Sequence, residues 1–120
     1  MVKTNILGTE YTFEMADLNF PDIEGFDGKC YTYSKRIVVR DPQYLLPDGT
    51  EDAKRQRFKE TLIHELIHGY CKESGVFYDD NENLVDWIAF MLPKIVNSYN
   101  DITQQIKENN KVGSKDKVSG

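Results

Sequence analysis

Residues 64–68 read His-Glu-Leu-Ile-His, which has the form H-E-x-x-H and contains both histidines of the 120-residue chain. Residues four apart lie on one face of an α-helix about one turn apart, so the imidazoles of His64 and His68 can reach a single metal ion. Glu65 projects from the neighbouring strip of such a helix, where its carboxylate can act on a water molecule without ligating the metal. The spacing makes the histidines candidate ligands and Glu65 a candidate general base, whereas the alternative is two ordinary helix histidines.

The sequence around this motif predicts one long helix over about residues 53–74. Thr50 or Asp52 is a suitable N-cap residue, and Gly75 is suitable for the C-terminal end. The two histidines lie at the edge of the apolar stripe of this helix, so they can lie beside the core and still face a cleft. That stripe consists of Leu62, Ile63, Leu66, Ile67, Tyr70 and Cys71.

Short segments of alternating or β-branched residues before this helix predict strands. Tyr11, Phe13 and Met15 alternate with polar residues, and we expect them on one buried face. The segments 17–29 and 41–52 contain proline and glycine and are expected to be loops. The four predicted strands are residues 2–7 and 10–15, joined at Gly8-Thr9, and residues 30–33 and 36–40, joined at Ser34-Lys35.

A second helix is predicted over about residues 81–97, with two apolar faces. Val85 and Ala89 form one of them, on which the carboxylates of Glu82 and Asp86 also lie. A helix with two apolar faces is expected to be sandwiched inside the domain, which would bury both carboxylates. The other face consists of Leu84, Ile88, Met91 and Ile95.

A zinc site with two histidines needs at least one more protein ligand and an open position. Buried carboxylates need partners, and a metal bound by Glu82 together with an imidazole N–H held by Asp86 would satisfy both. Glu82 could instead stabilise the helix N-terminus or form a capping box with Asp79, and Asp86 could be a solvated residue. The candidates for the third ligand are Cys71, Glu73, Asp79, Asp80, Glu82 and Asp86.

Residues 81–86, Asn-Glu-Asn-Leu-Val-Asp, resemble the N-E-x-x-x-D helix of the gluzincins, the thermolysin-like metallopeptidases. In that family the glutamate is the third zinc ligand and the aspartate supports the first histidine. The resemblance therefore implies a Zn2+ site with His64, His68 and Glu82 as ligands, Glu65 as catalytic acid/base and Asp86 behind His64. The compact order of elements is closer to the minigluzincins and the ImmA/IrrE-like peptidases.

Composition and length limit the remaining possibilities. The chain carries 15 basic and 20 acidic residues, for a net charge of −5, so nucleic acid is not expected as a partner. Two cysteines do not make a disulfide framework. Without an apolar run long enough for a bilayer or a basic-then-apolar leader, we expect a cytoplasmic protein that does not contact the membrane.

We expect an α+β domain in residues 1–100, with a small, mostly antiparallel sheet packed on the H-E-x-x-H helix and the glutamate-bearing helix behind it. This is a zincin-like arrangement. Residues 101–120 are polar and rich in lysine and asparagine, and they are expected to form a disordered tail.

The resemblance implies a small zinc metalloendopeptidase acting on a protein or peptide, such as a repressor-type regulator. Zincins bind the peptide extended along an edge strand, and residues 36–40 are expected to be that edge. Two alternatives remain open. One is a protein that keeps the zincin scaffold for binding or inhibition without peptidase activity, and the other is an enzyme that uses iron or manganese.

Overall fold

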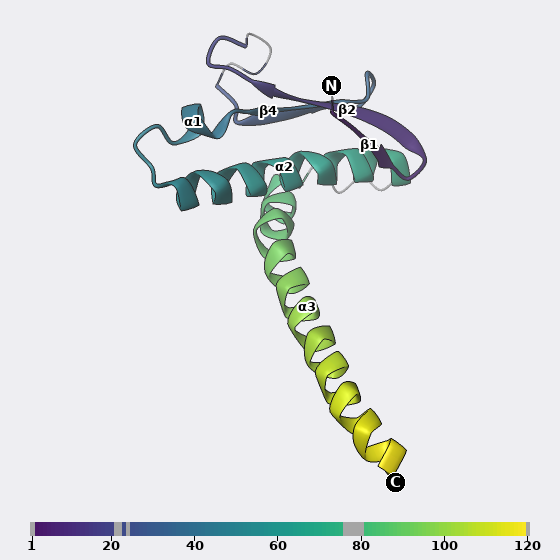
Figure 1. The fold of residues 1–120 in the computed structure, drawn as a ribbon. Coiled ribbons are helices and arrows are strands. Elements are labelled where there is room, and N and C mark those ends of the chain that lie inside the picture. The colour runs from purple at the N-terminus through teal and green to yellow at the C-terminus, as the bar shows by residue number, and fades with distance from the viewer. Residues whose placement is uncertain (1, 21–22, 24, 76–80, 120) are drawn as a thin grey trace. The chain divides into compact units, whose positions relative to one another are not determined.

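The computed structural model describes residues 2–20, 23, 25–75 and 81–119, with side chains as far as residue 109 (Figure 1). It consists of two compact units, residues 1–89 and residues 90–120. The first unit combines a four-stranded mixed sheet with helices, which confirms the predicted α+β class. In the described ranges no helix has the combination of length and hydropathy that crossing a membrane requires.

The sheet has the strand order β1-β2-β4-β3. The β1–β2 and β3–β4 pairs are antiparallel, whereas β2 and β4 are parallel. The predicted edge position of residues 36–40 is wrong, because β4 lies between β2 and β3, and the edge strands are β1 and β3. The strands are β1 (Val2–Ile6), β2 (Thr9–Ala16), β3 (Gly28–Tyr31) and β4 (Arg36–Arg40).

The turn between β1 and β2 comprises Leu7 and Gly8, one residue earlier than predicted. Both have positive φ angles, 51° and 93°, as the tight turn of a two-residue hairpin requires. The side chain of Asn5 accepts a hydrogen bond from the Gly8 N–H at 2.8 Å. This turn sets the register in which Ile6 faces Thr9.

Two further local predictions need correction. The third strand begins at Gly28 and ends at Tyr31, so Tyr33, predicted to be a strand residue, lies in the following turn. The predicted loop 41–52 contains a short helix, α1 (Pro42–Leu45). The Asp41 side chain accepts a hydrogen bond from the Gln43 N–H, and Pro42 suits the first helical position because its missing N–H is not needed there.

The long helix α2 (Glu51–Ser74) has the predicted caps. The Thr50 hydroxyl accepts a hydrogen bond from the Ala53 N–H at 3.1 Å, and Gly75 ends the helix with a φ of 74°. Its buried residues are Thr61, Glu65 and Gly69, which recur every fourth position on the side facing the sheet. The predicted apolar stripe is displaced from this line, and its residue Tyr70 is exposed.

The core consists of two clusters on opposite faces of the sheet, because neighbouring residues of β4 point in opposite directions. Ile37 and Val39 belong to the cluster that includes residues of α2, whereas Val38 belongs to the second cluster with Ile23. Tyr11 and Phe13 contribute to the first cluster as predicted, but Met15 is 46% exposed. The first cluster holds α2 against the sheet, because Phe58, Leu62 and Leu66 of this helix pack on its buried strand residues.

The last helix, α3 (Glu82–Ser119), begins within the first unit and continues through the second. Its predicted end near residue 97 is wrong, since α3 continues to Ser119 and pairs such as Gln104 and Glu108 support it one turn apart. The disorder predicted for residues 101–120 in solution stays a prediction. Within the first unit the two predicted apolar faces are covered to different extents, because Val85 and Ala89 are buried while Leu84 and Ile88 are only half-buried.

Candidate metal centre

Helix α2 brings its two histidines together beside the sheet. Because Thr61, Glu65 and Gly69 face the sheet, His64 and His68 lie at the side of the helix, where both are half-buried. Their Nε2 atoms are 3.2 Å apart. The i, i+4 spacing therefore produces the convergence of the two imidazoles that the sequence predicted.

Glu82 completes a group of three side chains. Its Oε2 atom lies 3.1 Å from Nε2 of His64, and its Oε1 atom lies 3.3 Å from Nε2 of His68. The start of α3 is capped by Asn81, whose side chain accepts a hydrogen bond from the Leu84 N–H at 3.1 Å. Asn81 thus caps the N-terminus of α3, and the Glu82 carboxylate is directed at the two histidines.

The spacing of these three donors fits a zinc ion. Ligand atoms about 2.0–2.2 Å from a tetrahedral zinc are roughly 3.3 Å from one another. The two Nε2 atoms are 3.2 Å apart, and different oxygens of Glu82 face them, Oε2 at 3.1 Å from His64 and Oε1 at 3.3 Å from His68. Two histidines and one carboxylate are also a donor set that zinc accepts. These residues could therefore hold a metal ion with a further position left for water.

Asp86 contacts the other side of the first histidine. Its Oδ1 atom lies 2.8 Å from Nδ1 of His64, so a proton on Nδ1 would leave Nε2 as a lone-pair donor directed toward Glu82. The side chains of Glu82 and Asp86 are 60% and 68% exposed, so the predicted burial of these carboxylates is wrong. Their contacts with His64 and His68 do not depend on that burial.

Glu65 is the buried acidic group of the centre, with 7% of its surface exposed. Burial raises the pKa of its carboxyl from 4.5 to about 7, and the negative charges of Glu82 and Asp27 act in the same direction. The positive charge of His64 and a hydrogen bond from the Cys30 backbone N–H act against this pKa increase. A carboxyl of this kind can exchange a proton near neutral pH, as a general base must.

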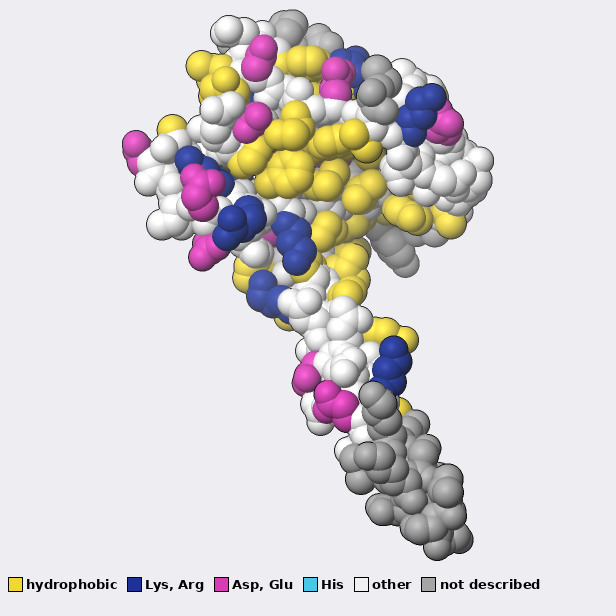
Figure 2. All heavy atoms as spheres, viewed as in Figure 1, with side chains coloured by type: hydrophobic (Ala, Val, Ile, Leu, Met, Phe, Trp, Pro, Cys, Tyr) yellow, Lys and Arg dark blue, Asp and Glu magenta, His cyan; other side chains and the backbone are white. Residues whose placement is uncertain are grey.

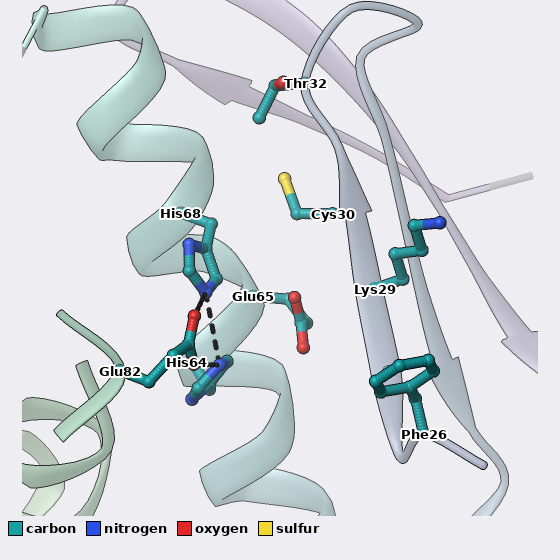
Figure 3. Close-up of a pocket in the computed structure, with 9 residues that line it drawn as sticks. Phe26, Lys29, Cys30, Thr32, His64, Glu65, His68 and Glu82 are labelled. Atoms are coloured by element: carbon teal, nitrogen blue, oxygen red, sulfur yellow. Dashed lines mark hydrogen bonds and ion pairs between the residues drawn. The ribbon is translucent and has the colours of Figure 1, made fainter. Parts of the chain in front are cut away.

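A pocket of about 420 Å3 opens between α2 and β3. Figure 3 shows Glu65 directed toward β3, with His64, His68 and Glu82 grouped next to it along α2. The strand side of the pocket was not predicted, because it depends on which strand is at the sheet edge. It consists of Phe26, Gly28, Lys29 and Cys30, with Thr32 in the turn beyond.

Gly28 lets β3 approach α2 closely at this point. A Cβ atom there would lie 3.1 Å from Cγ2 of Thr61 and 3.3 Å from Cγ of Glu65. Next to it, the Asp27 carboxylate pairs with the Arg57 guanidinium of α2, with an Nε–Oδ2 distance of 2.8 Å. Neither residue was singled out from the sequence, since nothing local indicates that this loop contacts α2.

Two of the other predicted ligand candidates, Glu73 and Cys71, are described and lie outside the centre. Glu73 accepts hydrogen bonds from Thr9, Tyr11 and Lys35 at 2.7–2.8 Å, which ties the end of α2 to the sheet. Cys71 is absent from the groups of possible ligands found among the described residues. Asp79 and Asp80 lie outside the described residues, as does the capping box predicted for Asp79.

Comparison of the chain with protein-family models, with curated proteins and with solved structures gives no significant match. The geometry of this centre and the H-E-x-x-H motif that forms it are therefore the basis on which a function can be proposed.

Proposed function

We propose that the chain is a small zinc-dependent endopeptidase of gluzincin type that acts on a protein or peptide in the cytoplasm. The observation that carries the proposal is the convergence of His64, His68 and Glu82, with donor separations that suit one tetrahedral ion. The contact between Asp86 and Nδ1 of His64 supports it, because ligating histidines usually donate their second N–H to a carboxylate or carbonyl.

In this proposal Glu65 moves the protons of the hydrolysis. Its carboxylate takes a proton from the attacking water and then transfers it to the amine nitrogen as the peptide bond breaks. A zinc ion in the centre supplies Lewis-acid polarisation of the scissile carbonyl and makes the water more acidic. The burial of Glu65 keeps the pKa of its carboxyl near neutral pH, so this group can both accept a proton and donate one.

The substrate strand would lie along β3. This strand is an edge of the sheet and lines the same pocket as both histidines and Glu65. An edge strand offers backbone N–H and C=O groups to which an extended peptide can pair. Residue Gly28 has no side chain to obstruct the helix side of β3, so the pocket remains continuous with that edge.

Cleavage of a mixed peptide library, analysed by mass spectrometry, tests the proposal. Zinc-loaded wild-type protein should release new peptide termini, whereas Glu65→Gln should retain zinc and lose cleavage. Glu60→Gln on the same helix is the matched control, because Glu60 is half-buried and lies outside the pocket, and it should cleave like wild type. Equal cleavage by wild type and Glu65→Gln would contradict the assigned role.

A binding or inhibitory protein on the same scaffold is the second candidate. The observation that favours it is that the pocket lining found among the described residues includes no tyrosine, and no histidine besides His64 and His68, to stabilise an oxyanion. Such a protein should bind its partner equally well after Glu65→Gln. A partner that is captured but never cleaved by zinc-loaded wild type would favour this candidate over the peptidase.

A further inference from the structure

The second unit carries a row of exposed apolar side chains along α3. Five residues, each 40–65% exposed, recur at intervals of three and four positions: Leu92, Ile95, Tyr99, Ile102 and Ile106. Figure 2 shows hydrophobic side chains along the described part of this helix, next to charged and uncharged polar ones. We call these five residues the α3 stripe.

The spacing of the α3 stripe is informative about what covers it. Alternating steps of three and four give an average of 3.5 residues, the repeat by which two helices pack side by side as a coiled coil. A helix packed on a sheet or in a globular core usually shows a broader apolar face. The stripe is narrow, since Lys94, Asp101 and Glu108 recur every seventh residue outside it.

We propose that the α3 stripe is a self-association surface on which a second copy of this chain packs helix against helix. The residues flanking the stripe favour an identical partner. In coiled coils, salt bridges between residues at these flanking positions determine which helices pair. In this chain the flanking residues are Val96, Ser98, Thr103 and Gln105. None of the four is charged, so a second copy meets no repulsion along the seam and a foreign helix gains no charge complementarity.

The size of the stripe is sufficient for a weak dimer. Covering the exposed parts of its five side chains removes on the order of 500 Å2 per copy, or about 1,000 Å2 in the pair, near the lower limit for a specific interface. The helix also needs such packing, because asparagine, serine and β-branched residues in this segment are weak helix formers. We therefore expect self-association in roughly the micromolar range.

Sedimentation velocity of the full chain at increasing concentration tests the proposal. Wild type should shift from the 13.9 kDa monomer to a species of twice that mass. Ile102→Lys places a charge in the seam and should raise the dimer dissociation constant more than about tenfold. Gln104→Lys adds the same charge outside the stripe, where Glu108 lies one turn away, and should dimerise like wild type.

The fluorescence of Trp87, the single tryptophan, shows that the first unit stays folded in each variant. A chain that remains monomeric at every concentration overturns the proposal and leaves the stripe to another partner or to the first unit of its own chain. Dimers that survive Ile102→Lys, or that are lost equally in Gln104→Lys, also overturn it. None of these outcomes depends on the zinc-peptidase proposal.

Discussion

Oδ1 of Asp86 lies 2.8 Å from Nδ1 of His64, on the opposite side of the imidazole from the Nε2 atom that faces Glu82. Asp86 of α3 thus orients the imidazole ring, while Glu82, one turn earlier on the same helix, faces the other ring nitrogen. A histidine held in this way presents a lone pair in a fixed direction, which lowers the entropy cost of binding a metal.

Asp86→Ala should therefore weaken zinc binding by about 10- to 100-fold, because His64 loses the carboxylate that orients its ring and increases its basicity. Competition with a chromophoric zinc chelator measures the affinity. Asp48→Asn is the control, since Asp48 is exposed in a loop and outside the centre, and its affinity should equal that of wild type. An unchanged affinity in Asp86→Ala would show that the contact has no role in metal binding.

Glu65 should make the metal-free protein less stable as the pH rises. Its folded pKa of about 7 exceeds the usual 4.5, so the folded state binds more protons between these values and loses stability as they dissociate. Glu65→Gln removes this dependence and should be more stable than wild type above pH 7 by about 3 kcal/mol. Urea unfolding in the presence of a chelator measures the difference, which should vanish below about pH 4.5.

Glu73 should show the opposite dependence. Hydrogen bonds from Lys35, Tyr11 and Thr9 lower the pKa of its carboxyl to about 2. The unfolded state therefore binds more protons between about pH 4.5 and 2, so the stabilisation is complete above this window and is lost as the pH falls through it. Urea unfolding should show Glu73→Gln less stable than wild type at neutral pH and equal to it near pH 2.

Glu60→Gln is the matched control for both titrations, because the half-buried Glu60 side chain forms its one described hydrogen bond with Gln56. Its stability should follow the wild-type pH dependence throughout. If the difference between Glu73→Gln and wild type did not change with pH, the carboxylate would not be the source of the stabilisation.

Gly69 allows α2 to approach β1. A Cβ atom at this position would lie 2.9 Å from Cδ1 of Ile6, which is fully buried. Gly69→Ala should destabilise the protein by about 1 kcal/mol, since overpacking exceeds the gain in helix propensity. In an Ile6→Val background that methyl group is gone, and the same change should stabilise by up to about 1 kcal/mol. Additive effects in this cycle would rule out the steric explanation.

Local features were predictable from the sequence because they depend on neighbours along the chain. Helix α2 begins after Thr50 and ends at Gly75, and both ends are set by hydrogen bonds and backbone angles within one turn. The convergence of His64 and His68 follows from helix geometry alone. The resemblance led us to expect Glu82 near both histidines and Asp86 near His64, and the side chains do lie there, while their role in binding a metal stays a prediction.

Features that depend on distant segments were missed. The edge position of β3 follows from the parallel pairing of β2 with β4, which no turn residue indicates. Consequently the strand side of the pocket, including Gly28, and the Asp27–Arg57 pair next to that glycine were not predicted. The exposure of Glu82 was also missed, because an apolar pattern on two sides of a helix indicates burial only where other elements cover both sides.

The most direct test of the proposed metal centre is the zinc content of protein purified without added metal, measured by mass spectrometry of the element. Wild type and Glu73→Gln should each carry one zinc per chain, since Glu73 binds the sheet and not the centre. His64→Ala and Glu82→Ala should lose most of it. Wild-type protein that binds no zinc at neutral pH, even when zinc is supplied, would contradict the proposed centre and the peptidase function with it.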